Sequence, residues 1–197
     1  WLLFFCLKKK YGEGEGVCVK ASPLSEKIYL RKINEHNPDL VVILDRPLLS
    51  QEIIDKINVP IVWIDHHPPV DRKGVNYYNP LLNDKNDNRP TSYWAYRVVK
   101  ENEWIAVMGI IGDWFVPEKK ILDKFKFKDL IKGAKTAPEY LFDTPYGKLI
   151  KILSFAMKGT TSSTKECINA LLKIKSPLEI LDASTKDGKI VYEKYVK

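Results

Sequence analysis

The sequence predicts an α/β fold, with a mostly parallel sheet flanked by helices and a helical later half. Residues 40–44 and 61–64 are short, apolar and rich in β-branched side chains, which is typical of parallel strands that helices cover on both faces. Between them, Ser50 can cap a helix over residues 51–58, whose isoleucines form one apolar stripe. This order of strand, helix and strand predicts a parallel pair with a right-handed connection.

The later half is predicted to be helical because its apolar residues recur at helical spacing. Four helices are expected there: residues 93–100 capped by Thr91 or Ser92, residues 104–112, residues 147–158, and residues 165–174 capped by Ser162, Ser163 or Thr164. Residues 27–34 suit either a helix or a strand. Residues 1–7 are interpreted as the end of a buried helix.

The composition is that of an ordinary globular protein. The chain has 197 residues, a formal net charge of +7 and 45% hydrophobic residues, which fits one domain or one domain with a small appendage. No segment reaches the roughly 18 apolar residues that cross a bilayer, so no membrane partner is expected. The three cysteines are widely spaced, so neither a disulfide framework nor a thiolate zinc site is predicted, and a cytoplasmic location is expected.

One stretch of the chain is strongly basic. Between residues 118 and 135, seven lysines face three acidic residues, and Lys124, Lys126 and Lys128 alternate with two phenylalanines. Such a strip suits the backbone and the stacked bases of a single-stranded nucleic acid. The alternative is a solvated, lysine-rich surface.

Each proposed strand runs directly into an acidic residue. Asp45 follows the first strand, Asp65, His66 and His67 follow the second, and Asp113 ends the apolar segment that precedes it. Because the C-terminal ends of parallel strands line the binding crevice of an open sheet, we expect these clusters to face the same opening.

A metal ion is the simplest reason to gather such residues. Carboxylates brought together repel each other and lose solvation unless a cation lies among them, whereas carboxylate and imidazole ligands together suit Mn²⁺, Mg²⁺ or Zn²⁺. Since side chains alternate along a strand, one of the two adjacent histidines is expected to bind the metal directly. The alternative is that Asp45 and Asp113 are helix caps or surface residues and that the histidine pair is a polar strand edge.

The motifs that contain these residues resemble those of the DHH phosphoesterase family. This family includes RecJ-type single-strand exonucleases, oligonucleotide-degrading enzymes, cyclic-dinucleotide phosphodiesterases and, more distantly, family II inorganic pyrophosphatases. Residues 41–45 (VVILD), 64–68 (IDHHP) and 109–113 (GIIGD) are similar to its second, third and fourth motifs. Asn79-Pro80 and Thr91-Ser92 are similar to the archaeal RecJ-like branch. The resemblance implies a DHH domain over residues 1–175, with residues 176–197 as an extension or linker towards a substrate-binding domain.

The resemblance also implies a role for each motif residue. Asp45 would bridge two metal ions, and His66 and Asp113 would bind one of them. Asp65 would orient the site or act as a weak metal ligand, and His67 would contact the scissile phosphate. The implied cofactor is a pair of Mn²⁺ ions, with Mg²⁺ as the alternative.

The implied activity is hydrolysis of phosphodiester bonds in single-stranded nucleic acid or short oligonucleotides. Two other functions stay open: a catalytically silent subunit that binds a replication or repair protein partner, and a small-molecule phosphatase or pyrophosphatase. The family's H-x-D-x-D first motif has no match in this sequence, and we expect it upstream of Trp1. The glycine-rich G-G-G-H signature of the usual substrate-binding domain has no match either.

Overall fold

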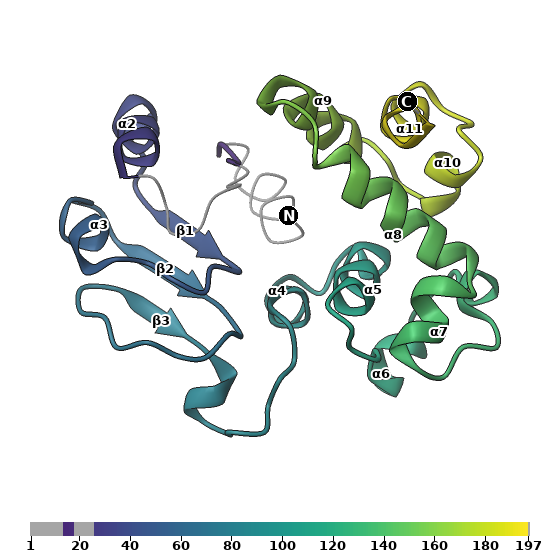
Figure 1. Ribbon diagram of the computed structural model, residues 1–197, viewed down its shortest axis with the longest axis horizontal. Coiled ribbons are helices and arrows are strands. Elements are labelled where there is room, and N and C mark those ends of the chain that lie inside the picture. The colour runs from purple at the N-terminus through teal and green to yellow at the C-terminus, as the bar shows by residue number, and fades with distance from the viewer. Residues whose placement is uncertain (1–13, 18–25, 197) are drawn as a thin grey trace.

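The computed structural model describes residues 14–17 and 26–196. A parallel sheet comes first and a helix-rich half follows, which confirms the predicted α/β class. In Figure 1 the sheet lies on one side of the molecule with α2 (Glu26–His36) and α3 (Gln51–Asp55), and the later helices lie on the other side. Helix α4 (Thr91–Val99) lies between these two parts. The helix end expected within residues 1–7 falls outside the described residues.

Among the described residues, three parallel strands form the sheet in the order β1, β2, β3. They are β1 (Val41–Leu44), β2 (Ile61–Ile64) and β3 (Asn76–Tyr78). In the register of β1 and β2, Val41 is opposite Ile61. The first two strands were predicted, whereas β3 was not. Because all three strands run in the same direction, the residues that follow them leave the sheet at one edge.

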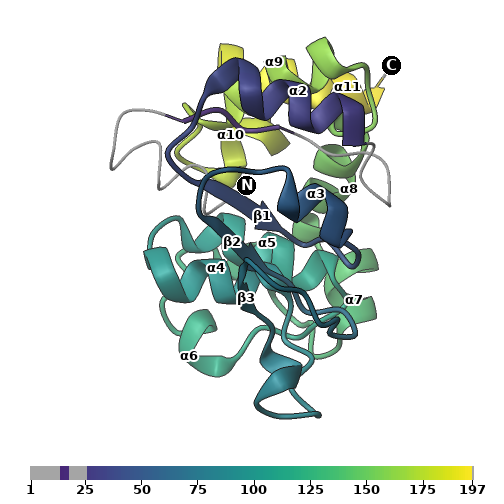
Figure 2. The same ribbon diagram turned by 90° about the vertical axis from the view of Figure 1, so that its left-hand side faces the viewer.

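Helices cover both faces of β1 and β2, which explains why these strands are apolar throughout. On one face, Trp63 is fully buried with Ile53 and Ile54 of α3. On the other face, Ile64 packs against Ala95 of α4. Figure 2 views the molecule from the side of the sheet and shows α2 above β1 and α3 beside it. Ser50 caps α3 as predicted, although this helix ends at Asp55 rather than at residue 58.

The second half contains most of the helices. The 3₁₀ turn η1 (Pro80–Leu82) follows β3 and precedes α4. The elements of the second half are α5 (Glu103–Gly112), α6 (Lys119–Leu122), η2 (Lys128–Ile131), α7 (Ala137–Phe142), α8 (Pro145–Ala156), α9 (Thr161–Leu171), α10 (Pro177–Leu181) and α11 (Lys186–Val196). The largest core of the described residues lies here and includes Ile110, Ile111 and Leu149, all fully buried. The buried hydroxyl of Tyr146 donates a hydrogen bond to the carbonyl oxygen of Trp104 and so joins α8 to α5.

Two predicted helix caps are wrong, and one undecided segment is settled. Helix α4 starts after Pro90, so Thr91 is its first residue and no side chain caps it. Helix α9 starts at Thr161, and Thr160 caps it by accepting a hydrogen bond from the backbone of Ser163. Several hydroxyl residues in a row can each serve as a cap, so the sequence does not distinguish among them. Residues 27–34 are helical, as part of α2.

Helices α4 and α5 are in close contact where α5 has a glycine. A Cβ atom added at Gly109 would lie 2.6 Å from the Cβ of Ser92. Only a residue without a side chain therefore fits between the two helices at this point. This contact fixes the position of α5, and with it the position of Asp113 at the helix end, relative to α4 and the sheet.

The last two helices pack against the preceding ones. Ile180 of α10 and Val191 of α11 are fully buried in the core of the helical half. Helix α10 begins with a capping box, in which Ser176 and Glu179 each bind the other's backbone. The boundary predicted at residue 175 stays a prediction. Within residues 14–17 and 26–196, none of the helices has the length and apolar character that crossing a membrane requires.

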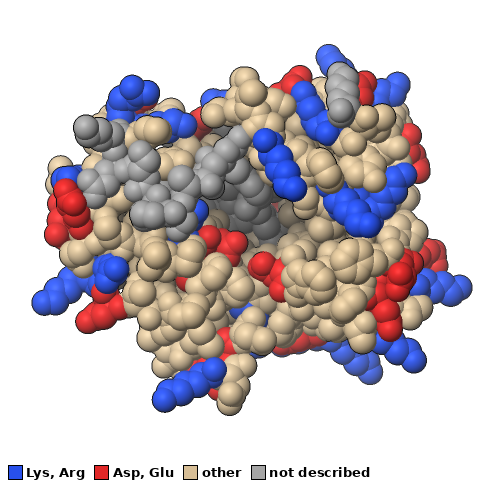
Figure 3. Space-filling view, viewed as in Figure 1, with Lys and Arg blue, Asp and Glu red and all other residues tan. Residues whose placement is uncertain are grey.

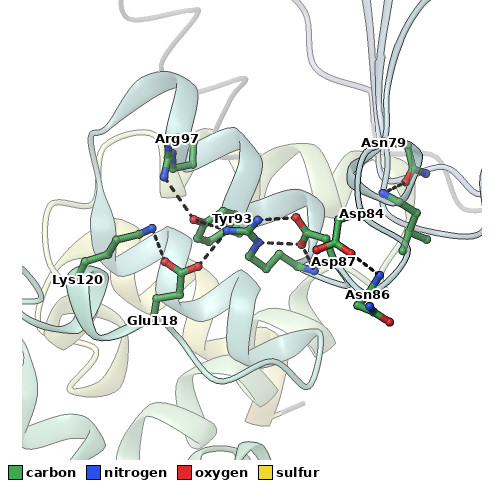
Figure 4. A network of polar contacts seen from close by, with 10 residues as sticks. Asn79, Asp84, Asn86, Asp87, Tyr93, Arg97, Glu118 and Lys120 are labelled. Carbon is green, nitrogen blue, oxygen red and sulfur yellow. Dashed lines mark hydrogen bonds and ion pairs between the residues drawn. The ribbon is translucent and has the colours of Figure 1, made fainter.

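A polar network fixes the loop that joins η1 to α4 (Figure 4). The Arg89 guanidinium donates hydrogen bonds to both carboxylate oxygens of Asp87. It also donates to Glu118 Oε1 at 3.1 Å and to the Tyr93 hydroxyl at 3.0 Å. The hydrogen bond from Arg89 lowers the pKa of Asp87. The network therefore ties the loop to α4 and to the segment before α6.

Candidate metal centre

Asp45 occupies a sharp turn at the end of β1. Its backbone N–H donates to the carbonyl oxygen of Ile64 at 3.0 Å, so the strand pairing continues up to this residue. Its φ of 57° is left-handed, a conformation that Asp tolerates better than most side chains because its short polar group can bond locally. The chain thus turns away from the sheet at this acid, and its side chain is half exposed.

Asp65 lies directly after β2 and supports His67. It is fully buried, and its backbone N–H donates to the carbonyl oxygen of Tyr78 in the neighbouring strand. Its Oδ1 lies 2.8 Å from His67 Nδ1, and its Oδ2 accepts a hydrogen bond from the His67 backbone N–H at 3.1 Å. Both oxygens of Asp65 therefore hold His67, and Asp65 is not among the side chains gathered around His66.

Asn79 follows β3 and supports the same turn. It is 1% exposed, and its Nδ2 lies 2.8 Å from both the His67 carbonyl oxygen and the Tyr77 hydroxyl. Its Oδ1 accepts a hydrogen bond from the backbone of Leu81. The sequence indicated Asn79 only as part of a resemblance, because nothing in the local pattern shows that a buried amide will hold the histidine segment.

Asp113 ends α5, and Trp114 completes the helix end. The backbone N–H of Trp114 donates to Ile111 and that of Phe115 donates to Ile110, which is the Schellman arrangement for the end of a helix. Trp114 takes the left-handed position of this motif, with φ of 60°, where glycine is the usual residue. An L side chain in this conformation costs about 1–2 kcal/mol.

The segments that carry Asp45 and Asp113 meet at His66. Its Nε2 lies 3.5 Å from Asp45 Oδ1 and 3.9 Å from Asp113 Oδ2. Ligand atoms of Asp45, His66 and His67 all lie within 4.8 Å of one another. Figure 3 shows acidic side chains in the middle of this face, between the sheet and the later helices.

The spacing suits a divalent ion. Ligand atoms bound octahedrally at about 2.1 Å from one ion lie roughly 3.0 Å apart as neighbours and about 4.2 Å apart on opposite sides. The two distances from His66 fall within that range. Carboxylate oxygens together with imidazole nitrogen are a donor set that Mn²⁺, Zn²⁺ or Fe²⁺ accepts. The side chains of Asp45, His66 and His67 therefore fit a metal ion, and Asp113 approaches this group at His66.

The electrostatics of Asp113 indicate the same need for a cation. Burial raises the pKa of Asp113, and the nearby charge of Asp45 raises it further, while His66 and His67 lower it in part. The folded protein thus holds a carboxylate where its negative charge is disfavoured. A cation among these groups would remove that cost.

In the basic strip, the lysines are exposed but one of the two phenylalanines is buried. Lys124, Lys126 and Lys128 are exposed, so their contact with nucleic acid stays a prediction. Phe125, however, is 1% exposed and packs edge-on against Tyr146, with ring centroids 5.4 Å apart. Phe125 is part of the core and cannot stack on a base, because no face of its ring reaches the surface.

Neither the scan against protein-family models nor the search of curated proteins finds a match to this chain. The geometry of the site is therefore the basis on which a function can be proposed.

Proposed function

We propose that this protein is a metal-dependent phosphodiesterase of the DHH, RecJ-like type that acts on single-stranded nucleic acid or short oligonucleotides. The observation that carries the proposal is the convergence of Asp45, His66 and Asp113 from three separate segments. They converge at the edge where parallel strands end, which is the usual place for a ligand in an open α/β sheet.

Metal binding explains why the fold tolerates the two acids. Burial and the charge of Asp45 disfavour the ionised form of Asp113, and a divalent ion held among these groups and His66 would offset that cost. Such ions polarise a phosphate and lower the pKa of bound water to about 7, which supplies hydroxide near neutral pH. The resemblance assigns Asp45 to a bridging position between two ions.

His67 is suited to contact the substrate. With its Nδ1 held by the buried Asp65, the ring is fixed in orientation and its Nε2 is left to reach an oxygen of the substrate. The two histidine rings lie side by side, with centroids 4.5 Å apart. A phosphate bound near His66 would therefore lie within reach of His67 as well.

The experiment is an activity assay with matched variants. The protein is incubated with Mn²⁺ and end-labelled single-stranded DNA, single-stranded RNA or a dinucleotide, and the products are separated on a gel. We expect cleavage by the wild type and its loss in Asp45→Asn and His66→Ala. Asp39→Asn is the control, because Asp39 is an exposed acid at the opposite end of β1. If all three substrates stay intact, or if Asp45→Asn keeps full activity, the proposal is wrong.

The same assay distinguishes the two alternative functions. A small-molecule phosphatase or pyrophosphatase would release phosphate from pyrophosphate or a simple ester and leave the strands uncut. A silent subunit would cleave none of these substrates and would bind a replication or repair protein instead.

A further inference from the structure

We propose that Trp114 and Phe142 form a stacking platform for a nucleobase beside the candidate metal centre. The platform would make the site selective for phosphodiesters that carry a base. This inference rests on the proposed function, because it names the part of the substrate that lies next to the reacting phosphate.

An exposed aromatic side chain lies next to Asp113 in the chain. Trp114 is the residue directly after Asp113, whose Oδ2 lies 3.9 Å from His66 Nε2, and consecutive Cα atoms are about 3.8 Å apart. Its side chain is 60% exposed. The exposed Trp114 side chain is therefore one residue from Asp113 along the chain.

Trp114 contacts a second exposed aromatic side chain. Phe142, the last residue of α7, is 59% exposed. The two ring centroids are 5.9 Å apart and the ring planes are inclined at 60°. Two exposed aromatic rings from different parts of the chain thus lie against each other at the surface. Rings arranged in this way offer apolar faces to a third flat group.

The backbone of Trp114 has an unusual conformation. It occupies the left-handed position of a Schellman helix end, where glycine would fit without strain. Because most of the ring is exposed, packing does not explain a tryptophan in this position. Strained residues of this kind concentrate at binding sites, where the strain serves to place the side chain.

A lysine lies over the Phe142 ring. Lys151 Nζ lies 5.3 Å from the centroid of the Phe142 ring, and Lys151 is itself exposed. Aromatic rings flanked by a cation suit a base together with its phosphate, and base stacking of this kind depends little on sequence. A base within a duplex is already stacked, so the platform favours single strands and dinucleotides.

The experiment compares two strands that differ only in their bases. One is a short oligothymidylate, and the other has the same length and the same phosphates but is abasic. Affinities are measured by fluorescence anisotropy with Ca²⁺ in place of Mn²⁺, so that the strands are not consumed. The variants are Trp114→Gly, Phe142→Ala and Trp114→Phe. The control is Val98→Ala, which truncates an exposed apolar residue of α4.

We expect the wild type to bind the base-bearing strand roughly 5- to 150-fold more tightly than the abasic strand. Trp114→Gly and Phe142→Ala should bring this ratio close to one, whereas Trp114→Phe should keep most of it and Val98→Ala all of it. Glycine suits the left-handed position, so Trp114→Gly is expected to fold, and its circular dichroism verifies this.

The outcomes separate the platform from the proposed function. If the wild-type ratio is near one, or if Trp114→Gly keeps the wild-type ratio, the platform is ruled out, whether or not the protein cleaves strands. If the ratio changes as expected but no strand is cleaved in Mn²⁺, the platform stands and the proposed hydrolysis fails.

Discussion

At the scale of single residues, Asp65 acts through its neighbour. Its two carboxylate oxygens bind the ring and the backbone of His67, and it is fully buried. A side chain of this kind fixes the tautomer and the orientation of a histidine without touching the substrate.

The substitution Asp65→Asn tests this role. Asparagine keeps the shape of the side chain but replaces one acceptor oxygen with a donor, so one of the two hydrogen bonds to His67 is lost. We expect the rate of phosphodiester cleavage to fall roughly 10- to 100-fold. Initial rates measured beside the Asp39→Asn control give the answer, and an unchanged rate would show that His67 does not depend on Asp65.

The charge of Asp113 is expected to destabilise the metal-free protein. Its folded pKa lies above the ordinary value of 3.8, first because of burial and second because of Asp45. The fold therefore disfavours the ionised form, so at neutral pH its charge lowers the free energy of unfolding of the metal-free protein. This loss disappears as the pH falls through the folded pKa.

We expect Asp113→Asn to melt at a higher temperature than the wild type in EDTA at pH 7, and to gain less stability from Mn²⁺. Thermal melts with and without the metal measure both effects. A variant that melts lower in EDTA, or that keeps the whole Mn²⁺ shift, would contradict this account of the site.

At the scale of elements, the contact between α4 and α5 controls where Asp113 lies. The glycine pair in α5 provides a matched test, because a Cβ at Gly109 would meet Ser92 at 2.6 Å, whereas one at Gly112 would meet only Ile150, at 3.8 Å. Gly109→Ala should lower the free energy of unfolding by about 1–3 kcal/mol through overpacking. Gly112→Ala should raise it by about 0.5–1 kcal/mol, because alanine favours a helix.

Urea denaturation of the two variants measures this difference. Equal stabilities would mean that α4 and α5 do not approach each other as closely as the structure has them.

The Arg89 network supports the loop before α4 and predicts a dependence on pH. The hydrogen bond from Arg89 lowers the pKa of Asp87. Burial raises the pKa of Glu118, but hydrogen bonds from Lys120 and Arg89 outweigh it, so the pKa of Glu118 is lowered overall. Carboxylates with lowered pKa values contribute stability above their ordinary values of 3.8 and 4.5. That contribution is lost as the pH falls through the folded values.

Arg89→Ala should therefore cost about 1–3 kcal/mol at pH 7, and the difference from wild type should shrink at pH 3. Arg31→Ala is the control, because its pair with Glu35 is exposed and is worth at most about 0.5 kcal/mol. Urea denaturation at both pH values gives the comparison. An Arg89→Ala variant as stable at pH 7 as Arg31→Ala would show that the network does not hold the loop.

The sequence predicts two of the strands, but it does not predict β3 or the starts of α4 and α9. Strands β1 and β2 were predictable because burial on both faces leaves them apolar and β-branched. Strand β3 was not, because its three residues, Asn76, Tyr77 and Tyr78, carry no such pattern and depend on β2 for their pairing. The cap of α9 was misplaced because Thr160 lies in a run of hydroxyl residues that can each begin a helix, whereas α4 begins after Pro90 without a side-chain cap.

At the scale of the whole molecule, the parallel topology explains why the sequence could predict that Asp45 and His66 lie close together. Acids that follow parallel strands share one edge, so the proximity of Asp45 and His66 follows from the order of elements along the chain. The sequence does not tell which aromatic residues stay exposed. Phe125 lies between lysines and yet is buried, whereas Trp114 follows an apolar helix and is exposed.

The central claim is that Asp45, His66 and Asp113 bind a divalent ion, and calorimetric titration with Mn²⁺ tests it most directly. We predict binding by the wild type and by Asp39→Asn, with affinity at least roughly 10-fold weaker in Asp45→Asn, His66→Ala and Asp113→Asn. A free Mn²⁺ concentration of 100 times the dissociation constant should add about 2.7 kcal/mol to the free energy of unfolding. The same Mn²⁺ affinity in all five proteins, or no binding in any, would contradict the claim.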